Sequence, residues 1–458
     1  MYTIVSETKK DRLLMKAITL FSSAGIGDLA IKKHGIEILV ANEIVESRVA
    51  LHRQNFPETE MIQGDIWTMQ EKIVAKTLER LQRDELDFVF ATPPCQGMSK
   101  NGQGKLLRGI RDGLKPKLDE RNQLIIPTLK IIKKLNPRTV FFENVPEMIF
   151  TVILDENGEP VNIIDYIERE LGNEYVGKPE VVQFADYGIP QRRSRLITIY
   201  SRDEKLKRYF SQSKSFIPEK THSSEPNKKL KSWVTVRDVI GSLPPLDGKN
   251  KKMATSDIPF HRVSVLDPKK YIWISNTPPE KGAFDNQCIN PKCGYQGNLT
   301  HGSSKDHDGI NRANGHTPLY CEKCGEILPR PYTVEKDGSK RIMAGYTSAY
   351  KRMSWSLPAP TLTTNLSYPS SDHKVHPEQN RVLSLYEAFL IHTLNEFNYE
   401  WRFKDDGQVP DTVIAEVIGE SIPPKGIYLI IEHLLNVFYS HEIKLPSEYQ
   451  LSLLDYSG

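Results

Sequence analysis

The stretch Asp87-Phe88-Val89-Phe90-Ala91-Thr92-Pro93-Pro94-Cys95-Gln96-Gly97-Met98-Ser99 decides the fold class of this 458-residue chain. Its apolar beginning predicts a buried strand of an α/β sheet. Neither Pro93 nor Pro94 can donate to a β-ladder, so the strand must end there. Cys95 is therefore expected on a rigid turn at the carboxyl end of a strand, where ligands gather in open α/β sheets. An incidental loop cysteine is the alternative.

Turns nearer the start of the chain have the composition of a nucleotide-type cofactor site. A predicted strand, 17–21, leads into Ser22-Ser23-Ala24-Gly25-Ile26-Gly27-Asp28, where small residues let the main chain approach a ligand. The following helix offers N–H groups to a phosphate or carboxylate. A second strand ends at Glu43, 18 positions after Gly25, where a carboxylate could accept from ribose hydroxyl groups. Asp65 follows another turn, near the expected adenine edge. A nicotinamide dehydrogenase would fit these features as well as a methyltransferase.

A carboxylate is expected at the same sheet edge as the cysteine. Residues 139–142 predict another strand, which delivers Glu143 to the edge that carries Cys95. A glutamate at a strand end could be a solvated cap, but pairing with Cys95 across one βαβ unit favours a functional role. Between them, residues 97–117 contain Gly, Lys and Arg with little apolar periodicity. This composition predicts a mobile loop that could close on a polyanion.

Arginines lead into a further predicted strand, residues 196–200. In Gln191-Arg192-Arg193-Ser194-Arg195 the alternation of a strand places Gln191, Arg193 and Arg195 on one face. Two arginines on one face could simply bind phosphate groups.

Four of the five cysteines form two close pairs, Cys288-x₄-Cys293-Gly294 and Cys321-x₂-Cys324-Gly325. A thiolate pair followed by glycine lets main-chain N–H groups point at sulfur, and four sulfurs satisfy tetrahedral zinc. We therefore predict a structural Zn²⁺ site, closed by four thiolates and without a catalytic role. Reduced loop thiols are the alternative.

Composition indicates a globular protein of two or three domains. Hydrophobic residues make up 38% of the chain and charged residues 26%, and the net charge of +3 is too small to establish a nucleic-acid partner. Residues 1–12 lack an apolar signal core, and no stretch approaches the roughly 20 apolar residues of a membrane span. We expect a cytoplasmic enzyme without a membrane partner.

Six motifs in order resemble those of the cytosine-C5 DNA methyltransferases of bacterial restriction-modification systems. Pro93-Pro94-Cys95-Gln96 resembles the nucleophile motif, Glu143-Asn144-Val145 matches a second motif without departure, and Gln191-x-Arg193-x-Arg195 resembles a third. The likeness spans about Phe21 to Leu434. An added zinc-ribbon-like insert at 288–324 is not a general feature of this family.

Two departures from the family pattern concern the cofactor site. The family usually shows Phe-Ser-Gly-x-Gly-Gly after the first strand, and this chain keeps only Gly25, with Ser23 and Ile26 at the flanking glycine positions. The last motif usually contains Asn where this chain has Glu420, which could weaken a contact with the cofactor carboxylate or strengthen one with its ammonium group.

The resemblance implies a complete active site. Cys95 would attack C6 of cytosine, Glu143 would bond N3 and the exocyclic amine, and Arg193 and Arg195 would hold the base and the glutamate. The cofactor would be S-adenosyl-L-methionine, and its expected binding residues are Phe21, Ser22, Gly25, Gly27, Glu43, Asp65, Ile66, Pro93 and Ser421.

The resemblance also implies an α/β fold: a doubly wound mixed sheet with a second, mostly β/loop target-recognition domain. We expect the catalytic domain at 1–202, the recognition domain at 203–409 and a return to the catalytic domain at 410–458. The implied partner is double-stranded DNA, methylated by a monomer, with a cognate restriction endonuclease acting independently. The alternatives are a transfer RNA cytosine-C5 methyltransferase and a non-catalytic zinc-ribbon DNA-binding protein with a degenerate methyltransferase domain.

Overall fold

The computed structural model describes residues 15–94, 119–300, 303–305, 311–313, 316–343, 348–404 and 407–440. Cys95 and the loop predicted at 97–117 lie outside the described residues. Among the residues that are described, no helix is long and apolar enough to cross a membrane.

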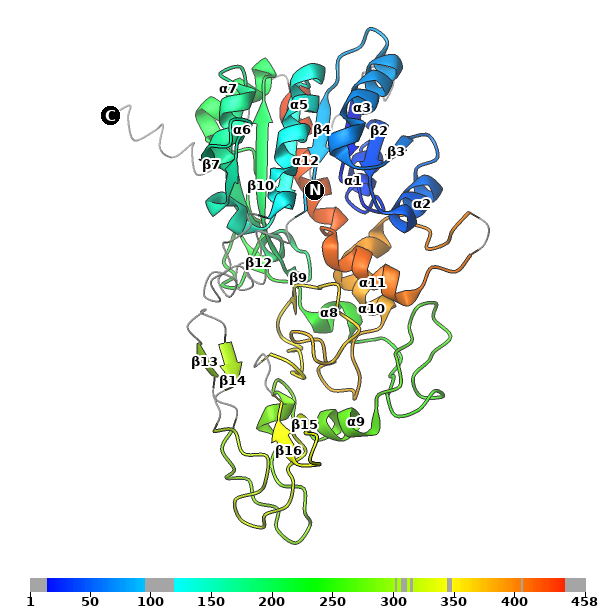
Figure 1. Cartoon of the computed structure of the whole chain (residues 1–458), viewed down its shortest axis with the longest axis vertical. Helices are drawn as coiled ribbons and strands as arrows, with labels where there is room; N and C mark the ends of the chain where they lie inside the picture. Colours follow the sequence, from blue (N-terminus) through cyan, green and yellow to red (C-terminus); the bar gives the residue numbers. More distant parts are fainter. Residues whose placement is uncertain are drawn as a thin grey trace, which may run out of the picture.

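A seven-stranded mixed sheet forms the upper part of the molecule (Figure 1), in the order β3-β2-β1-β4-β5-β10-β8. Strands β1 to β5 run parallel, and β10 is antiparallel to both β5 and β8. The sheet strands are β1 (Lys16–Leu20), β2 (Glu37–Glu43), β3 (Glu60–Gln63), β4 (Phe88–Ala91), β5 (Thr139–Asn144), β8 (Val176–Gln183) and β10 (Ser194–Ser201). The predicted doubly wound mixed sheet is confirmed.

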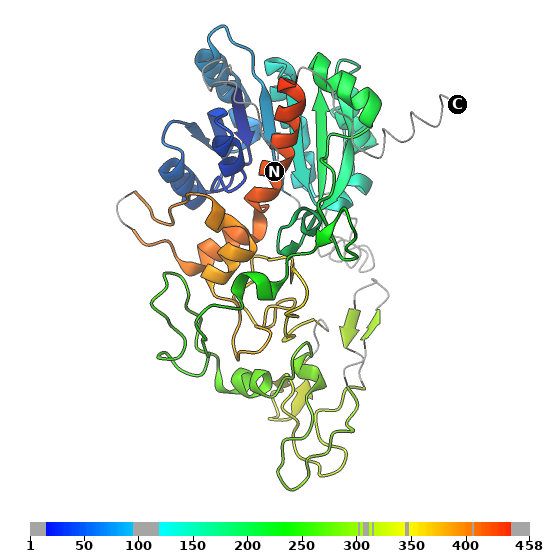
Figure 2. The same cartoon turned by 180° about the vertical axis from the view of Figure 1, so that it is seen from behind.

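Helices cover both faces of the sheet because its strands are apolar on both sides. Phe88 and Phe90 of β4 join one core cluster, whereas Val89 and Ala91 join the other. The helices on the first face (Figure 2) are α1 (Asp28–Lys33), α7 (Glu204–Ser213) and α12 (Pro424–Tyr439). Those on the second face are α3 (Ile66–Leu81), α5 (Ile125–Leu135) and α6 (Ile163–Leu171). Helix α2 (Glu46–Asn55) lies beside β2 and β3.

Most of the residues between α7 and α12 form the lower part of the molecule, which consists mainly of loops (Figure 1). A small core around Trp273, Phe284 and Tyr350 supports it. Its helices are α8 (Val236–Ile240) and α9 (Pro268–Ser275), and its strands are β11 (His222–Ser223), β12 (Lys231–Ser232), β13 (Ser303–Lys305), β14 (Asn311–Ala313), β15 (Tyr332–Val334), β16 (Lys340–Ile342) and β17 (Ala359–Pro360).

The lower part joins the sheet at the carboxyl ends of the parallel strands. Strand β17 pairs with β9 (Gln191–Arg192), which directly precedes β10. Because β10 is antiparallel to β5, its beginning lies at the carboxyl end of β5. This is the sheet edge to which Pro93 and Glu143 belong.

The chain returns to the sheet before residue 410. Helix α10 (Leu385–Ile391) contributes Leu385, Ala388 and Ile391 to the same core as α12. Leu206 and Tyr209 of α7 belong to that core as well. The predicted limits of the recognition domain, 203 and 409, stay predictions, and both end segments share the core of the sheet.

The remaining elements are short. They are β6 (Val152–Leu154) and β7 (Pro160–Asn162), helix α11 (Asp411–Glu420), and the 3₁₀ helices η1 (Glu120–Leu124), η2 (Pro146–Phe150), η3 (Phe184–Tyr187), η4 (Ala283–Asp285) and η5 (Leu394–Glu396).

Candidate active site

The Pro-Pro turn that precedes Cys95 is fastened to two neighbouring strand ends. The amide nitrogen of Thr92 donates to the Leu20 carbonyl at 3.2 Å, and its hydroxyl group donates to the Phe21 carbonyl at 3.0 Å. From the other side, Asn144 Nδ2 donates to the Pro93 carbonyl at 3.1 Å. Sequence reasoning placed Asn144 in a motif but gave it no role. Its position directly after Glu143 was the available signal.

Glu143 and Arg195 form an ion pair at this sheet edge. Arg195 Nε lies 2.8 Å from Glu143 Oε1, and their side chains are 13% and 10% exposed. Glu143 lies near the end of β5, and Arg195 lies on the adjacent β10, where the next residues pair with β5. The structure therefore brings these two predicted catalytic residues together. Water has limited access to the pair, which strengthens its electrostatic interaction with a ligand.

Arg193 does not share the place of Arg195, although strand alternation predicted one face for both. β9 ends at Arg192 and β10 begins at Ser194, so Arg193 lies at a break between the two strands. Its side chain is fully buried and donates to the carbonyl oxygens of Leu362 at 2.9 Å and Gly419 at 3.1 Å. These contacts indicate a structural role for Arg193 between distant parts of the chain.

The turn after β1 depends on unusual backbone conformations. Phe21 and Ser23 have φ angles of 59° and 48°, and Gly25 has a φ of 83°. A Cβ atom at Gly25 would lie 2.4 Å from Cε2 of Phe56. Glycine is therefore required both by the positive φ angle and by the lack of space for a side chain. At Gly27 a Cβ would lie 2.9 Å from a ring carbon of Phe90. The two glycines thus let this turn close against the sheet.

Glu43 receives main-chain N–H groups from the cofactor turn and from its own strand end. Its Oε1 accepts from Ile44 at 2.9 Å and Val45 at 2.8 Å, and its Oε2 accepts from Ser23 at 2.9 Å. Three donors fix the carboxylate in one orientation. A carboxylate has about four acceptor positions, so one position of Oε2 remains for a ligand hydroxyl group.

The other predicted cofactor residues differ in whether their side chains could reach a ligand. Asp65 caps α3 by accepting from the Trp67 amide at 3.0 Å with Oδ1, which leaves Oδ2 for a ligand. The side chain of Ser22 turns into the sheet toward Thr19. Ile66 is 2% exposed and packs in the core. Ser22 and Ile66 could therefore contact a cofactor only through their main chains.

Glu420 has an ion-pair partner that the sequence did not reveal. Its carboxylate lies 2.6 Å from Arg48 Nη2, on the helix after Glu43. Burial raises the pKa of Glu420, Arg48 opposes this shift, and the negative charges of Glu416 and then Glu43 add to it. Glu420 and Glu43 therefore lie within electrostatic range of each other. The partners are too far apart in the chain for any local pattern to have predicted the pair.

The four paired cysteines come together in the lower part of the molecule. All four Sγ atoms lie within 4.8 Å of one another, with Cys288–Cys324 at 3.7 Å and Cys293–Cys321 at 3.9 Å. Tetrahedral Zn²⁺ with bonds of about 2.3 Å places its sulfurs about 3.8 Å apart. Gly294 and Gly325, which follow the second cysteine of each pair, have φ angles of 55° and 73°. The donor set and its geometry fit zinc.

Comparison with known proteins places these features in a family. The C-5 cytosine-specific DNA methylase family matches residues 15–436. Type II methyltransferase M1.HgaI of Avibacterium volantium is 30% identical over 438 residues, covering 92% of this chain and 98% of that protein. M.AquIA of Picosynechococcus is 30% identical over 245 residues, covering 50% of this chain and 89% of that protein. A crystal structure of a candidate DNA modification methyltransferase from a prophage in Escherichia coli superposes with a TM-score of 0.50 at 20% identity, covering 93% and 100% of the two chains.

Proposed function

The chain belongs to the C-5 cytosine-specific DNA methylase family, and from this premise we propose how its own residues carry the reaction. The enzyme transfers a methyl group to C5 of cytosine in DNA, as type II methyltransferases of restriction-modification systems do. S-adenosyl-L-methionine supplies the methyl group when bound. Neither the transfer RNA alternative nor the non-catalytic alternative is favoured by a match of this extent.

We assign the nucleophile to Cys95. Cytosine C5 is a poor nucleophile until C6 is attacked, and a thiolate can form that bond and leave again. As the Cys95 sulfur bonds C6, electron density moves to C5, which takes the methyl group. Loss of the C5 proton then restores the double bond and releases the thiolate. The base must first leave the duplex, which costs a few kcal/mol.

The observation that carries this assignment is the Glu143–Arg195 pair beside the Pro-Pro turn. The carboxyl group of Glu143 would accept from the exocyclic amine of cytosine and share a proton with N3, which neutralises the negative charge that develops on the ring. Arg195, 2.8 Å from Oε1, orients the carboxylate and adds positive charge to the site. Asn144 keeps the turn of Pro93 against the end of β5. Arg193 is assigned a positioning role rather than a contact with the base.

Replacing Glu143 with glutamine is expected to lower methyl transfer at least about 100-fold, because the amide is neutral and cannot pair with Arg195 in the same way. Affinity for S-adenosylmethionine, measured by calorimetry, should stay within about two-fold. Glu180→Gln on β8 of the same sheet is the matched control and should keep full activity. Equal activity of Glu143→Gln and the wild type would contradict the role of Glu143.

We propose that the cofactor lies along the carboxyl ends of β1, β2 and β4. The available acceptor position of Glu43 suits a ribose hydroxyl group, and Asp65 Oδ2 suits the adenine amine. Phe21, Pro93 and the main chain near Gly25 and Gly27 would enclose the rest. Ser421 is partly exposed and follows Glu420, whose carboxylate pairs with Arg48 on the helix after Glu43.

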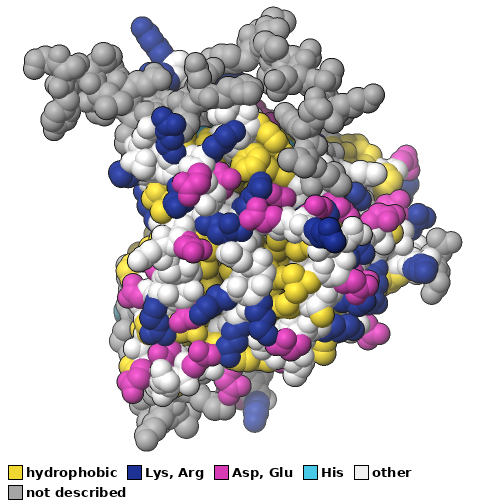
Figure 3. All heavy atoms as spheres, turned by 90° about the horizontal axis from the view of Figure 1, so that it is seen from above, with side chains coloured by type: hydrophobic (Ala, Val, Ile, Leu, Met, Phe, Trp, Pro, Cys, Tyr) yellow, Lys and Arg dark blue, Asp and Glu magenta, His cyan; other side chains and the backbone are white. Residues whose placement is uncertain are grey.

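Duplex DNA is proposed to lie between the carboxyl edge of the sheet and the lower part of the molecule. The opposite end of the sheet carries interspersed acidic and basic side chains (Figure 3). There Lys16 pairs with Asp84, and Arg138 and Arg202 share Glu85. Such balanced charge does not favour a polyanion. We further propose that the protein acts as a monomer in the cytoplasm, with a cognate restriction endonuclease acting independently.

We also propose that Cys288, Cys293, Cys321 and Cys324 hold one structural Zn²⁺. The purified protein should contain about one zinc per chain by atomic absorption, and Cys321→Ser should lose it. Because the metal replaces a core that this segment lacks, the melting temperature of the full chain should fall by about 5 °C or more. Cys95→Ser is the control and should keep its zinc. Protein purified without chelators that contained no zinc would contradict the assignment.

A further inference from the structure

A chain of hydrogen bonds joins Leu362, near the β17–β9 pairing, to Ser421 beside the cofactor site. The amide nitrogen of Leu362 donates to Gln191 Oε1 at 3.2 Å. Gln191 Nε2 lies 3.3 Å from Nδ1 of His392, and His392 Nε2 lies 3.0 Å from Ser421 Oγ. The Ser421 hydroxyl group donates to the Ile418 carbonyl at 3.2 Å.

The direction of every hydrogen in this chain is fixed by chemistry. The Leu362 amide can only donate, so the oxygen of the Gln191 amide must face it and the NH₂ group must face His392. Nδ1 of His392 then accepts, and the neutral ring carries its proton on Nε2, which donates to Ser421. The ring is fully buried. Burial, and then the positive charge of Arg193, lowers the pKa of His392 well below its ordinary value, and a main-chain hydrogen bond with Ile422 opposes this shift.

A second connection joins the same two segments independently. Arg193 donates to the carbonyl of Leu362 and to that of Gly419, so both polar groups of Leu362 are engaged. A Cβ atom at Gly419 would lie 2.1 Å from the amide nitrogen of Thr364, which shows that the two main chains touch. The segment around Leu362 and the segment from Gly419 to Ser421 therefore form one unit.

We propose that His392 is a positioning residue that orients the hydroxyl group of Ser421 toward the cofactor and, through Gln191, ties that orientation to Leu362. The proposal rests on the assignment of Ser421 to the cofactor site made above. With its hydrogen committed to Ile418 and one lone pair committed to His392, Ser421 offers the cofactor a single defined lone pair. Without the histidine, only the bond to the Ile418 carbonyl would hold this hydroxyl group.

The test measures the affinity for S-adenosylmethionine by calorimetry in His392→Leu, Ser421→Ala and the double variant. Each single change should weaken binding about ten-fold, since each removes the same oriented hydrogen bond. The double variant should also be about ten-fold weaker rather than about hundred-fold, because His392 acts only through Ser421. His392→Gln, which can accept and donate at the same two places, should stay within about three-fold of the wild type.

Two controls separate this role from a loss of structure. Leucine fills the buried site of His392 without a polar group, and thermal denaturation of each variant verifies that it is folded. His433→Leu, at a partly buried histidine farther along α12, should leave the affinity unchanged. Additive losses in the double variant, or equal losses in His392→Gln and His392→Leu, would overturn the proposal alone. Wild-type affinity in Ser421→Ala would overturn the cofactor assignment of Ser421 as well.

Discussion

Replacing Cys95 with serine is expected to reduce methyl transfer below detection, at least about 1,000-fold under the wild type. Attack at C6 requires an anionic nucleophile, and a thiolate is accessible near neutral pH. The serine hydroxyl group ionises far less readily, so the covalent step is lost while the size of the side chain barely changes. Affinities for S-adenosylmethionine and for DNA should both be kept, which distinguishes a lost nucleophile from a lost fold.

A trapping experiment isolates the covalent step itself. In duplex DNA whose cytosines carry fluorine at C5, the final loss of a proton from C5 cannot occur, so a covalent protein–DNA complex should accumulate. The wild type should form this complex in the presence of S-adenosylmethionine, and the complex should survive denaturing electrophoresis. The variant Cys95→Ser should not form it. Cys321→Ser at the proposed zinc site should still form it. A complex formed equally by Cys95→Ser would assign the nucleophile to another residue.

Breaking the buried ion pair between Arg381 and Glu387 is expected to lower the free energy of unfolding by about 3–5 kcal/mol. Arg381 donates to both carboxylate oxygens of Glu387, at 2.6 and 2.7 Å, and the side chains are 1% and 0% exposed. Methionine in place of Arg381 would leave a buried carboxylate without its cation. That group would have to be desolvated alone or take up a proton.

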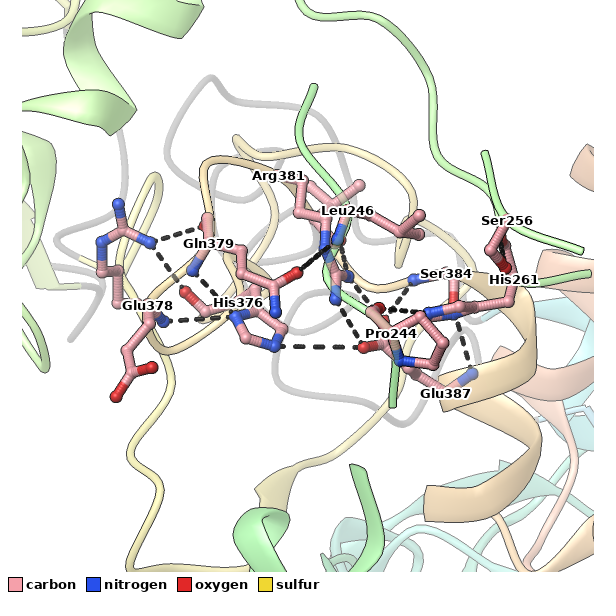
Figure 4. Close-up of polar contacts among 12 residues, drawn as sticks. Pro244, Leu246, Ser256, His261, His376, Glu378, Gln379, Arg381, Ser384 and Glu387 are labelled. Atoms are coloured by element: carbon pink, nitrogen blue, oxygen red, sulfur yellow. Dashed lines mark hydrogen bonds and ion pairs between the residues drawn. The ribbon is translucent and has the colours of Figure 1, made fainter. Parts of the chain in front are cut away.

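The surroundings of the pair leave little room for relaxation (Figure 4). Glu387 Oε2 also accepts from the Ser384 amide at 2.8 Å in the cap of α10. The Ser384 hydroxyl group lies 2.9 Å from Nδ1 of His261, whose Nε2 donates to the Pro244 carbonyl. His376 Nε2 lies 4.0 Å from Glu387 Oε1, but burial, followed by the charges of Arg381 and Arg352, lowers the pKa of His376 to about 2, so in the wild type Arg381 is the cation that faces this carboxylate.

Urea denaturation of Arg381→Met should show this loss, and Glu387→Gln should show a loss of the same order. Arg341→Met is the matched control, because Arg341 pairs with Glu335 at 2.8 Å while the two side chains are 58% and 43% exposed. An exposed pair contributes about 0–1 kcal/mol, so this control should be nearly neutral. A loss in Arg381→Met no larger than in the control would contradict the account of the buried pair.

The sequence predicted those parts of the site that follow from short-range patterns. The apolar run before Pro93 and the run before Glu143 became adjacent parallel strands, β4 and β5. Strand ends of a parallel sheet share an edge, so the position of Glu143 beside the Pro-Pro turn could be expected. Its meeting with Arg195 was implied only by the family resemblance. The spacing within the two cysteine pairs is also a local property of the sequence, and it predicted that the four sulfur atoms would come together.

Long-range contacts could not be predicted in this way. Glu420 meets Arg48 on a helix near the other end of the chain. Arg193 follows a two-residue strand whose end breaks the alternation, so its side chain turns to Leu362 and Gly419 instead of following Arg195. His392 lies at the end of a helical pattern, and the sequence does not distinguish a histidine with a specific hydrogen-bonding role from one that is simply packed in the core. Each of these contacts depends on how segments pack, and packing leaves no mark within a short window of sequence.

The measurement that tests the central claim most directly supplies the purified protein with tritium-labelled S-adenosylmethionine and unmethylated genomic DNA, with total transfer RNA in parallel. Bisulfite sequencing then maps the modified positions. We expect label at C5 of cytosine within one short DNA sequence, none in RNA, and none with Cys95→Ser. Label in RNA alone, or unchanged transfer to DNA by Cys95→Ser, would contradict a DNA cytosine-C5 methyltransferase that acts through Cys95.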